Sequence, residues 1–582
     1  MVLGGRSASQ AKRLSAKLEF DTLFLLAGAC VGHLSFVFHR PKDQNFIDRR
    51  RTKALLIHPY FHGASFWNYR DACKMLGAEY PSAPLGLITV AAILPDDWDV
   101  RLVDCNVRPL ADADLKWADV AMLGAMLPQW FDAVKLIARC KAAGVPTVVG
   151  GPDPTARPEI YVNADFAVLG EAEGAIDAFL ADWEAGVTSG LYRAPKFKID
   201  VTKTPAPRYD LLNLEAYLYV GVQFSRGCPF ICEFCDIIEL YGRVPRAKDL
   251  DQVLNELDGL YSLGYRGHVD FVDDNLIGNK KALKQFLPRL IEWQHGRGYP
   301  FEFSTEASLN LADDEELLSM MADARFFVVF IGIESPDDDV LTATLKKQNV
   351  KRDIAENVQR IYAHGIAVTA GFIVGFDSER DSVAAATVNL IEAAAIPIAM
   401  TGLLYALPDT QLSRRLAIEG RLHQELETPD GQLPPGDQCT AGLNFETLRP
   451  REEVLTDYAT VVRATFEPRA FFGRVQRAGA MLRFHKSDGA PRISLKDLRR
   501  FVHLAATVTA RFPEARMHFW GLVIATLLRN PTALKTAITM AALYTHFGPF
   551  SRFVAGEIDA QIARIEAGTQ PAPVMVSAIA VE

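Results

Sequence analysis

Short apolar runs alternate with helix-length segments twice along this chain, and that alternation is the strongest constraint on its fold. The first block has five such runs between residues 53 and 170, among them "KALLIHPY" (53–60) and "VPTVVGG" (145–151). They are rich in Val, Leu and Ala and end at Gly, Asp or Pro, which is typical of buried parallel strands. The pattern predicts an α/β domain, a doubly wound parallel sheet over residues 53–185, with its ligand at the carboxyl ends of the strands.

A second alternating block covers residues 217–420. It holds six candidate strands, from "YLYVGVQFS" (217–225) to "IAMTGLLYAL" (398–407), with a helix-sized pattern in each gap. Six strand–helix units predict a parallel sheet curled like part of a TIM barrel, a partial (β/α)6 barrel. Acidic residues follow several of these strands, at the end where barrel chemistry normally lies: Asp273, Asp274, Glu306, Glu334 and Asp377.

The remaining segments carry weaker patterns. Residues 186–216 are mixed polar with three prolines and two glycines, which predicts a linker. Residues 421–582 become helical and increasingly apolar, which predicts a mostly α-helical C-terminal domain. Within it, residues 517–554 form two helical runs, neither of clean spanning length, so we expect a buried helical pair. A lid over a lipid-like substrate is the alternative.

The N-terminal extension, residues 1–52, contains the apolar segment "FDTLFLLAGACVGHLSFVF" (20–38). It is long enough for a marginal membrane span, and basic residues on both sides leave its orientation undecided. A helix packed on the protein and a start codon placed too far upstream are the alternatives. We expect a non-spanning extension.

Composition is that of a water-soluble protein of several domains. The chain has 582 residues, of which 49% are hydrophobic and 23% charged, and a formal net charge of −9. This charge gives no general electrostatic reason to bind nucleic acid. The apolar segment 20–38 leaves contact with the inner face of a membrane as an alternative. Five cysteines are scattered singly, which predicts reduced thiols in a cytoplasmic protein: Cys30, Cys73, Cys105, Cys140 and Cys439.

Three other cysteines, Cys228, Cys232 and Cys235, lie within "SRGCPFICEFCD" (225–236) directly after a predicted barrel strand. A structural zinc site and a ferredoxin cluster each require four ligands. Three thiolates on a cubane cluster leave one iron open to a small molecule. Zinc binding and inert core thiols are the alternatives, and the spacing fits neither of them well.

The run "CPFICEFC" (228–235), as Cys-x3-Cys-x2-Cys at the start of a six-unit barrel, resembles the radical S-adenosylmethionine superfamily. The resemblance implies a [4Fe-4S] cluster whose open iron is chelated by S-adenosylmethionine, and a 5′-deoxyadenosyl radical that abstracts a hydrogen atom. It also implies an electron donor such as flavodoxin or ferredoxin. The implied S-adenosylmethionine contacts are Phe234, Asp273, Asp274, Glu306, Glu334 and Gly375.

The first domain has no Gly-x-Gly-x-x-Gly after its first strand, which argues against a dinucleotide site. Instead, the segments 81–95, 148–159 and 164–173 resemble the cobalamin-binding domain of the cobalamin-dependent radical S-adenosylmethionine branch. The Asp-x-His-x-x-Gly motif is absent, which implies cobalamin without a lower histidine ligand. A degenerate domain without cofactor is the alternative. The implied cobalamin contacts are Pro84, Leu85, Gly86, Gly150, Gly151, Gly170 and Glu171.

With both cofactors, this branch usually methylates an unreactive carbon or phosphorus. Residues 232–246, residues 268–281 and the helical tail resemble the subgroup that contains the hopanoid C-2 methylases. The resemblance implies a small, hydrophobic substrate, which the sequence does not identify. A rearrangement or cyclisation with the same cofactors and a non-catalytic cobalamin or redox sensor are the competing hypotheses.

Overall fold

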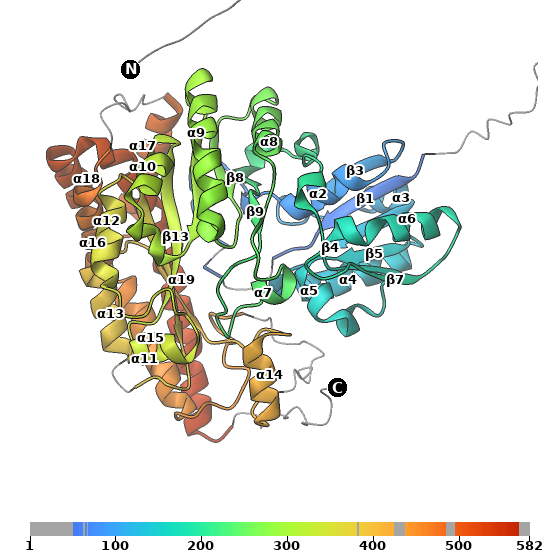
Figure 1. The fold of residues 1–582 in the computed structure, drawn as a ribbon. Helices are drawn as coiled ribbons and strands as arrows, with labels where there is room; N and C mark the ends of the chain where they lie inside the picture. Colours follow the sequence, from blue (N-terminus) through green and yellow to red (C-terminus); the bar gives the residue numbers. More distant parts are fainter. Residues whose placement is uncertain are drawn as a thin grey trace, which may run out of the picture. The chain divides into compact units, whose positions relative to one another are not determined.

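The fold is that of a computed structural model, which describes residues 51–569 except 62–64, 67, 381–382, 424–436 and 485–494. The apolar segment 20–38 and Cys30 lie outside the described residues. Two parallel sheets with their helices, and a set of C-terminal helices, make up the described chain (Figure 1).

The first sheet is parallel throughout, with the strand order β3-β1-β4-β5-β6-β7. All five runs predicted here are strands. The sequence analysis missed β7, which lies in the expected linker, because its four residues alternate between half-buried and exposed at the sheet edge. The strands are β1 (Lys53–His58), β3 (Asp99–Asp104), β4 (Val120–Gly124), β5 (Thr147–Gly150), β6 (Phe166–Leu169) and β7 (Gly190–Arg193).

Helices cover both faces of this sheet, as the doubly wound prediction requires (Figure 1). On one face α2 and α6 pack around Phe166 and Phe179. On the other, α3 and α4 bury Leu115, Trp130 and Ile137 against the strands. The helices are α2 (Leu85–Ile93), α3 (Asp112–Trp117), α4 (Trp130–Ala142) and α6 (Ile176–Glu184).

The second sheet has the order β15-β14-β13-β12-β11-β8-β2 and is also parallel. All six predicted barrel strands are present. Residues that face the surrounding helices are buried, whereas alternate residues on the inner face of β14 and β15 are half-buried, so solvent reaches the inside of the curl. The strands are β8 (Tyr217–Val222), β11 (Gly267–Phe271), β12 (Phe301–Ala307), β13 (Phe326–Glu334), β14 (Ala367–Val374) and β15 (Ala399–Leu403).

The seventh strand of this sheet, β2 (Tyr80–Ser82), comes from the first block of the sequence. It pairs with β8, so the chain leaves the first sheet after β1, adds an edge strand to the second, and returns through α2 to β3. The Tyr217 hydroxyl also donates a hydrogen bond of 2.9 Å to Asp104 at the end of β3. The two sheets therefore share both a strand and a buried polar contact.

The C-terminal region is helical, as predicted. Its longest helix, α19, packs against α15, α16 and α18 and buries Tyr544 and Phe547. No helix within the described residues is both long and apolar enough to cross a membrane. The expected burial of the helical pair holds for much of α19, but α18 exposes several apolar side chains. The helices are α14 (Gln411–Ile418), α15 (Arg451–Thr465), α16 (Pro468–Met481), α17 (Leu495–Arg511), α18 (Arg516–Arg529) and α19 (Leu534–Glu566).

A short hairpin of β9 (Ser225–Arg226) and β10 (Arg246–Ala247) frames the segment that carries the three clustered cysteines. Lys248, directly after β10, places its Nζ 2.5 Å from Oε1 of Glu256 on α8 (Leu250–Ser262). Both side chains are almost fully buried. This ion pair fixes the base of the hairpin to a barrel helix.

Replacing Lys248 by Met leaves the Glu256 carboxylate buried without its partner, which costs about 3–5 kcal/mol. We expect a clear fall in the apparent unfolding temperature of Lys248→Met. The double variant Lys248→Met/Glu256→Leu should recover most of the loss, because no charge stays buried. Equal destabilisation of the single and double variants would contradict this account.

Candidate active site

The three clustered cysteines lie in one loop between β9 and α7 (Ile237–Leu240). The loop begins at Gly227, whose φ of +98° favours glycine, and a Cβ there would lie 2.8 Å from the Gly242 carbonyl oxygen. Cys228 donates its backbone N–H to the same carbonyl. Cys232 is buried, whereas Cys228 and Cys235 are half-buried.

The sulfur atoms have surroundings that suit a metal cluster. Asn275 Nδ2 lies 3.8 Å from Cys228 Sγ, and Gln348 Nε2 lies 3.6 Å from Cys232 Sγ. Burial raises the pKa of the Cys235 thiol well above its ordinary value, so without a metal it is protonated. Within the described chain, no three His, Cys, Asp or Glu side chains lie close enough together to bind a single metal ion. A cubane cluster has a different requirement, because each thiolate binds its own iron.

Carboxylates gather at the strand ends beside this loop. One buried oxygen of Asp274, Oδ2, has no hydrogen-bond partner, and burial together with the charges of Asp273 and Asp236 raises the pKa of Asp274 to about 7. Burial and the charges of Asp274 and Asp270 raise the pKa of Glu306 to about 8. Glu306 is nonetheless solvent-exposed. A ligand with ammonium or sulfonium charge fits these carboxylates.

A lysine that the sequence analysis missed lies in the same place. Lys346 Nζ is 2.6 Å from Glu334 Oε1, and both side chains are about one-tenth exposed. Burial alone would lower the pKa of Lys346, but the charges of Glu334 and Cys232 outweigh it and raise that pKa. Its positive charge lies beside the cysteine loop. The polar run "KKQN" (346–349) after a barrel strand end was the available signal.

The other residues predicted around S-adenosylmethionine have different surroundings. Asp273 accepts hydrogen bonds from the backbone of Phe224 and Ser225, so it fixes the start of the cysteine loop. The Phe234 ring lies 5.7 Å from that of Phe376 and below Lys346 Nζ at 5.9 Å. Gly375 has a φ of +113° and donates its N–H to Glu379.

The glycines predicted around cobalamin lie at the carboxyl ends of the first sheet, in tight contacts. A Cβ on Gly150 would lie 2.9 Å from the carbonyl oxygen of Val168, and one on Gly151 would lie 2.8 Å from that of Ala125. Gly170 has a φ of +83°. A side chain at these positions would clash with the backbone or strain it, so the fold itself requires glycine here, whether or not cobalamin binds.

The sheet order reverses between β1 and β4, where open α/β sheets bind their ligands. His58 ends β1, and burial lowers its pKa, so the imidazole is uncharged at neutral pH. Met126, just after β4, is 51% exposed. The uncharged imidazole of His58 and the exposed side chain of Met126 suit a large, partly apolar ring such as a corrin. Sequence reasoning had not selected either residue, since neither belongs to a known motif.

Three further residues predicted for cobalamin lie where the two sheets meet. Pro84 is buried at the N-terminus of α2, which contacts β1, β4 and β8. Leu85 lies against Gly221 on β8, where a Cβ would be 3.4 Å from Leu85 Cδ2. Gly86 is exposed, with open space where a Cβ would be.

A buried ion-pair network connects the cysteine loop to the end of β6. Arg226, two residues before Cys228, lies 3.0 Å from Glu171 and 2.7 Å from Glu173. Arg246 of the paired strand lies 2.9 Å from Glu171. Burial would raise the pKa of Glu173, but hydrogen bonds and charge from Arg226 hold it below its usual value. Glu171, predicted to contact cobalamin, therefore already binds two arginines.

A second anchor holds the middle of the cysteine loop. Arg415 on α14 lies 2.5 Å from Glu233, the residue after Cys232, and 3.0 Å from Asp377. The backbone N–H of Glu233 also donates to the Thr344 carbonyl oxygen. The loop is thus held from the first sheet, from the barrel and from α14.

The inner face of the second sheet has a polar and an apolar part. On β8, β11 and β12 it carries Tyr219, His268, Asp270 and Ser304, and His268 Nε2 lies 2.5 Å from Ser304 Oγ. Burial lowers the pKa of His268 to about 3. On β13, β14 and β15 it carries half-buried apolar side chains: Val328, Phe330, Ile373 and Met400.

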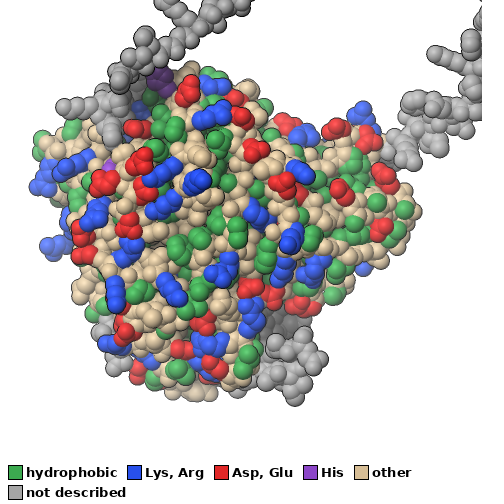
Figure 2. All heavy atoms as spheres, in the orientation of Figure 1, with side chains coloured by type: hydrophobic (Ala, Val, Ile, Leu, Met, Phe, Trp, Pro, Cys, Tyr) green, Lys and Arg blue, Asp and Glu red, His purple; other side chains and the backbone are tan. Residues whose placement is uncertain are grey.

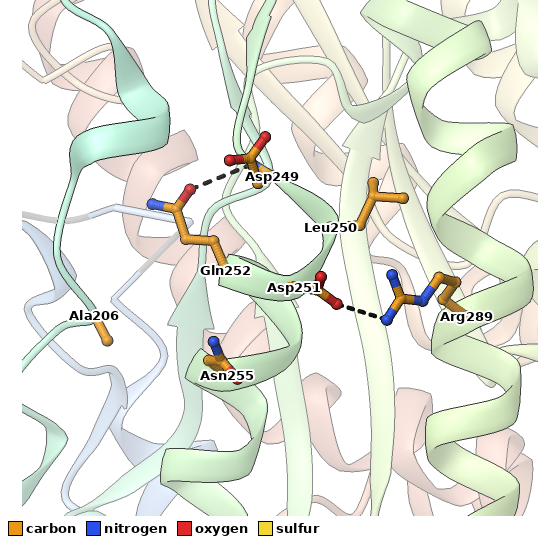
Figure 3. Close-up of a pocket in the computed structure, with 7 residues that line it drawn as sticks. All are labelled: Ala206, Asp249, Leu250, Asp251, Gln252, Asn255 and Arg289. Atoms are coloured by element: carbon orange, nitrogen blue, oxygen red, sulfur yellow. Dashed lines mark hydrogen bonds and ion pairs between the residues drawn. The ribbon is translucent and has the colours of Figure 1, made fainter. Parts of the chain in front are cut away.

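A groove of about 540 Å³ at the start of α8 lies outside the candidate site (Figure 3). Asp249 and Asp251 line it, and Arg289 pairs with Asp251 at 2.5 Å. None of the residues predicted for cofactor binding lines this groove. It is a polar surface feature in which Asp251 and Arg289 form an ion pair.

Three family models match the chain: the B12 binding domain over residues 75–180, the Radical SAM superfamily over 222–391, and a domain of unknown function (DUF4070) over 410–560. Among curated proteins, the uncharacterized methyltransferase sll1242 of Synechocystis sp. is 41% identical over 88% of this chain and 94% of its own length. The hopanoid C-2 methylase of Rhodopseudomonas palustris is 35% identical over 77% of this chain and 84% of its own length.

Solved structures agree on the fold. The radical S-adenosylmethionine methyltransferase TsrM from Kitasatospora setae, with cobalamin and a [4Fe-4S] cluster bound, has a TM-score of 0.56 at 14% identity and covers 82% of this chain and all of its own. The cobalamin-dependent S-adenosylmethionine radical enzyme OxsB has a TM-score of 0.55 at 13% identity, covering 90% of this chain and 82% of its own.

The raised pKa of Asp274 predicts a pH-dependent stability of the ligand-free protein. Between about pH 4 and pH 7 the folded chain keeps a proton that the unfolded chain has released, so stability falls as pH rises through this window. Asp274→Asn should therefore raise the apparent unfolding temperature by roughly 2 °C or more at pH 8, and by less near pH 4. Thermal scans at both pH values test this.

Asp210→Asn is the matched control, because hydrogen bonds and charge from Arg208 lower the pKa of Asp210. This variant should not gain stability at pH 8. A gain for Asp274→Asn of equal size at both pH values would contradict the assignment.

Proposed function

The chain belongs to the cobalamin-dependent radical S-adenosylmethionine methyltransferases, and we propose that it methylates an unactivated carbon of a hydrophobic, lipid-like molecule. A hopanoid-like lipid is one member of that class, as the name of the R. palustris relative suggests. The cofactors are a [4Fe-4S] cluster, S-adenosylmethionine and cobalamin.

The observation that carries the proposal is the ion-pair network between the cysteine loop and the first sheet. Arg226, at the end of β9 directly before the cysteine loop, binds Glu171 at the strand ends of the first sheet, where we propose that cobalamin binds. The small hollow at these strand ends is lined by Gly170 and Glu171, and also by Glu239 and Leu240 of α7. A radical source and a methyl donor must both reach one substrate, and an ion-pair network between the cysteine loop and the first sheet supports two neighbouring cofactor sites.

In this proposal, Cys228, Cys232 and Cys235 bind three irons of the cluster. Asp274 and Glu306 bind the positive groups of S-adenosylmethionine, with Lys346 balancing the carboxylates and Phe234 beside the adenine. Bound together, the cofactors supply one-electron cleavage of S-adenosylmethionine and a transferable methyl group. The protein's part is to orient the substrate between them and to exclude water.

The inner face of the barrel supports a hydrophobic substrate. Val328, Phe330, Ile373 and Met400 are half-buried there, although a closed core would bury them fully. Gly371 on β14 leaves room for the Phe330 ring, since a Cβ would lie 2.9 Å from that ring. An apolar molecule on β13–β15 would cover these side chains. The polar side formed by His268 and Asp270 then receives any hydroxyl that the molecule carries.

Two further parts of the proposal concern the setting of the reaction. A flavodoxin or a ferredoxin donates the electron that the cluster needs. The protein works in the cytoplasm, where its thiols and its cluster stay reduced, and it contacts the inner face of a membrane.

Anaerobic assays of the reconstituted enzyme test the proposal. With S-adenosylmethionine, a reductant and a lipid extract from a deletion strain, we expect 5′-deoxyadenosine, S-adenosylhomocysteine and a lipid heavier by one methylene. Cys232→Ala should lose the cluster iron and all three products. Cys140→Ala, which changes a buried cysteine of α4, should keep the iron and the products.

Methyl-deuterated methionine fed to the complemented deletion strain locates the product. The label should enter a molecule that organic solvent extracts. A labelled product found only in the aqueous fraction would refute a hydrophobic substrate, and 5′-deoxyadenosine without S-adenosylhomocysteine would refute methyl transfer.

Arg226→Met tests the role of the ion-pair network as a positioning device. We expect unchanged cluster iron and continued 5′-deoxyadenosine formation, but at least about a tenfold fall in methylated product per 5′-deoxyadenosine. A shift of that size corresponds to about 1.4 kcal/mol. Arg226→Lys, which keeps the charge but not the fork of donors, should give an intermediate ratio.

Arg208→Met, which removes an exposed pair with Asp210, is the control and should leave the ratio unchanged. If folded Arg226→Met with a full cluster also kept the wild-type ratio, the positioning role would be wrong.

A further inference from the structure

Helix α18 exposes apolar side chains where a surface helix normally carries polar ones. Leu528 is 80% exposed, Met517 76% and Ile524 56%. Between the terminal Arg516 and Arg529, no exposed position of this fully described helix carries a charge. These positions are Met517, Trp520, Gly521, Ile524, Leu527 and Leu528.

Helix α17 extends this apolar surface. Leu498 and Val502, one turn apart, are 50% and 58% exposed. Trp520 Nε1 on α18 donates a hydrogen bond of 3.0 Å to Thr509 on α17, and the rings of Trp520 and Phe501 lie 6.4 Å apart. The two helices therefore present one continuous surface, the α17–α18 surface, formed by Leu498, Val502, Met517, Trp520, Ile524, Leu527 and Leu528.

The opposite sides of both helices are buried in the protein. Val508 and Phe519 are 0% exposed, and Leu504 and Leu522 are almost fully buried. The helices thus already use one apolar side for the core, and the α17–α18 surface is a second one. Over the face drawn in Figure 2 as a whole, charged side chains of both signs are interspersed among the apolar ones.

The charge around this surface favours an anionic partner. Residues 497–529 contain five arginines and two acidic residues, in a chain whose net charge is −9. Arg516 and Arg529 lie at the two ends of the apolar side of α18. Apolar side chains flanked by arginine are typical of helices that lie in the interface of an anionic bilayer.

The length of α18 limits the orientation that this helix can take on a bilayer. The 14 residues of α18 span about 21 Å, less than the roughly 30 Å of a hydrocarbon core. The helix can therefore lie in the membrane plane but not cross the membrane.

We propose that the α17–α18 surface docks on an anionic lipid bilayer, with Trp520, Ile524 and Leu528 inserted among the headgroups and the flanking arginines on lipid phosphates. The proposal concerns binding alone and rests on no cofactor. It would stand if the substrate were water-soluble.

Co-sedimentation of the full chain with vesicles tests the docking. We expect binding to vesicles of phosphatidylcholine with phosphatidylglycerol, and weaker binding to phosphatidylcholine alone. Ile524→Glu/Leu528→Glu should lower the partition coefficient at least about tenfold. Val162→Glu/Leu448→Glu, at positions 74% and 67% exposed on other elements, should leave it within about twofold. Arg516→Glu/Arg529→Glu should remove most of the preference for anionic vesicles.

Three results would overturn the proposal. The wild-type chain could fail to bind any vesicle. Ile524→Glu/Leu528→Glu could bind as tightly as the wild type, which would assign binding to another segment, such as the apolar residues 20–38. Light scattering could reveal a dimer that this variant dissociates without any vesicle binding, which would identify a second copy as the occupant. Because the substituted side chains are exposed, unchanged thermal unfolding should verify that each variant is folded.

Discussion

The buried pairing of Arg226 with Glu171 and Glu173 is the interaction on which the arrangement of the site depends. A loop that wraps around three cysteines has little secondary structure of its own, so contacts with other elements must fix its position. Buried ion pairs add little net stability compared with apolar packing, but removing one partner is costly. Such a network therefore selects one arrangement. Here it selects the one in which the cysteine loop meets the strand ends of the first sheet.

The carboxylates at the strand ends of the barrel differ from this network in their electrostatics, because their pKa values are raised. Asp274 and Glu306 have pKa values raised to about 7 and 8 because each lies near other carboxylates in surroundings that disfavour negative charge. Folding thus favours the neutral form of these carboxyls, and the cationic ligand proposed for this site would favour the charged form instead. Lys346 neutralises Glu334 but leaves one oxygen of Asp274 unpartnered. Perturbed carboxylates of this kind are typical of functional sites.

Sequence patterns were sufficient for the strands that the core buries and for the cysteine loop, because hydrophobic period and cysteine spacing are local signals. They were not sufficient for β2 and β7, which are short edge strands whose pairing depends on distant partners. The same limit applies to single residues. Glu171 follows a strand as a ligand contact would, but its ion pairs with Arg226 and Arg246 depend on residues more than fifty positions away. Lys346 lies beside the cysteine loop only because the fold brings the segment after β13 next to the segment after β9. The ligand contacts themselves remain predictions.

The shared strand β2 has a consequence for how the protein can be divided. A fragment that starts at the linker would lack Tyr80–Ser82 and would leave β8 as an unpaired edge with free N–H and C=O groups. Unprotected edges of this kind recruit strands from other molecules and lead to aggregation. The complementary fragment would carry β2 without a sheet to join. The first and second blocks of the chain therefore have to stay together in evolution. Recombination that replaced one block alone would break the pairing of β2 with β8, even if both cofactor sites were intact.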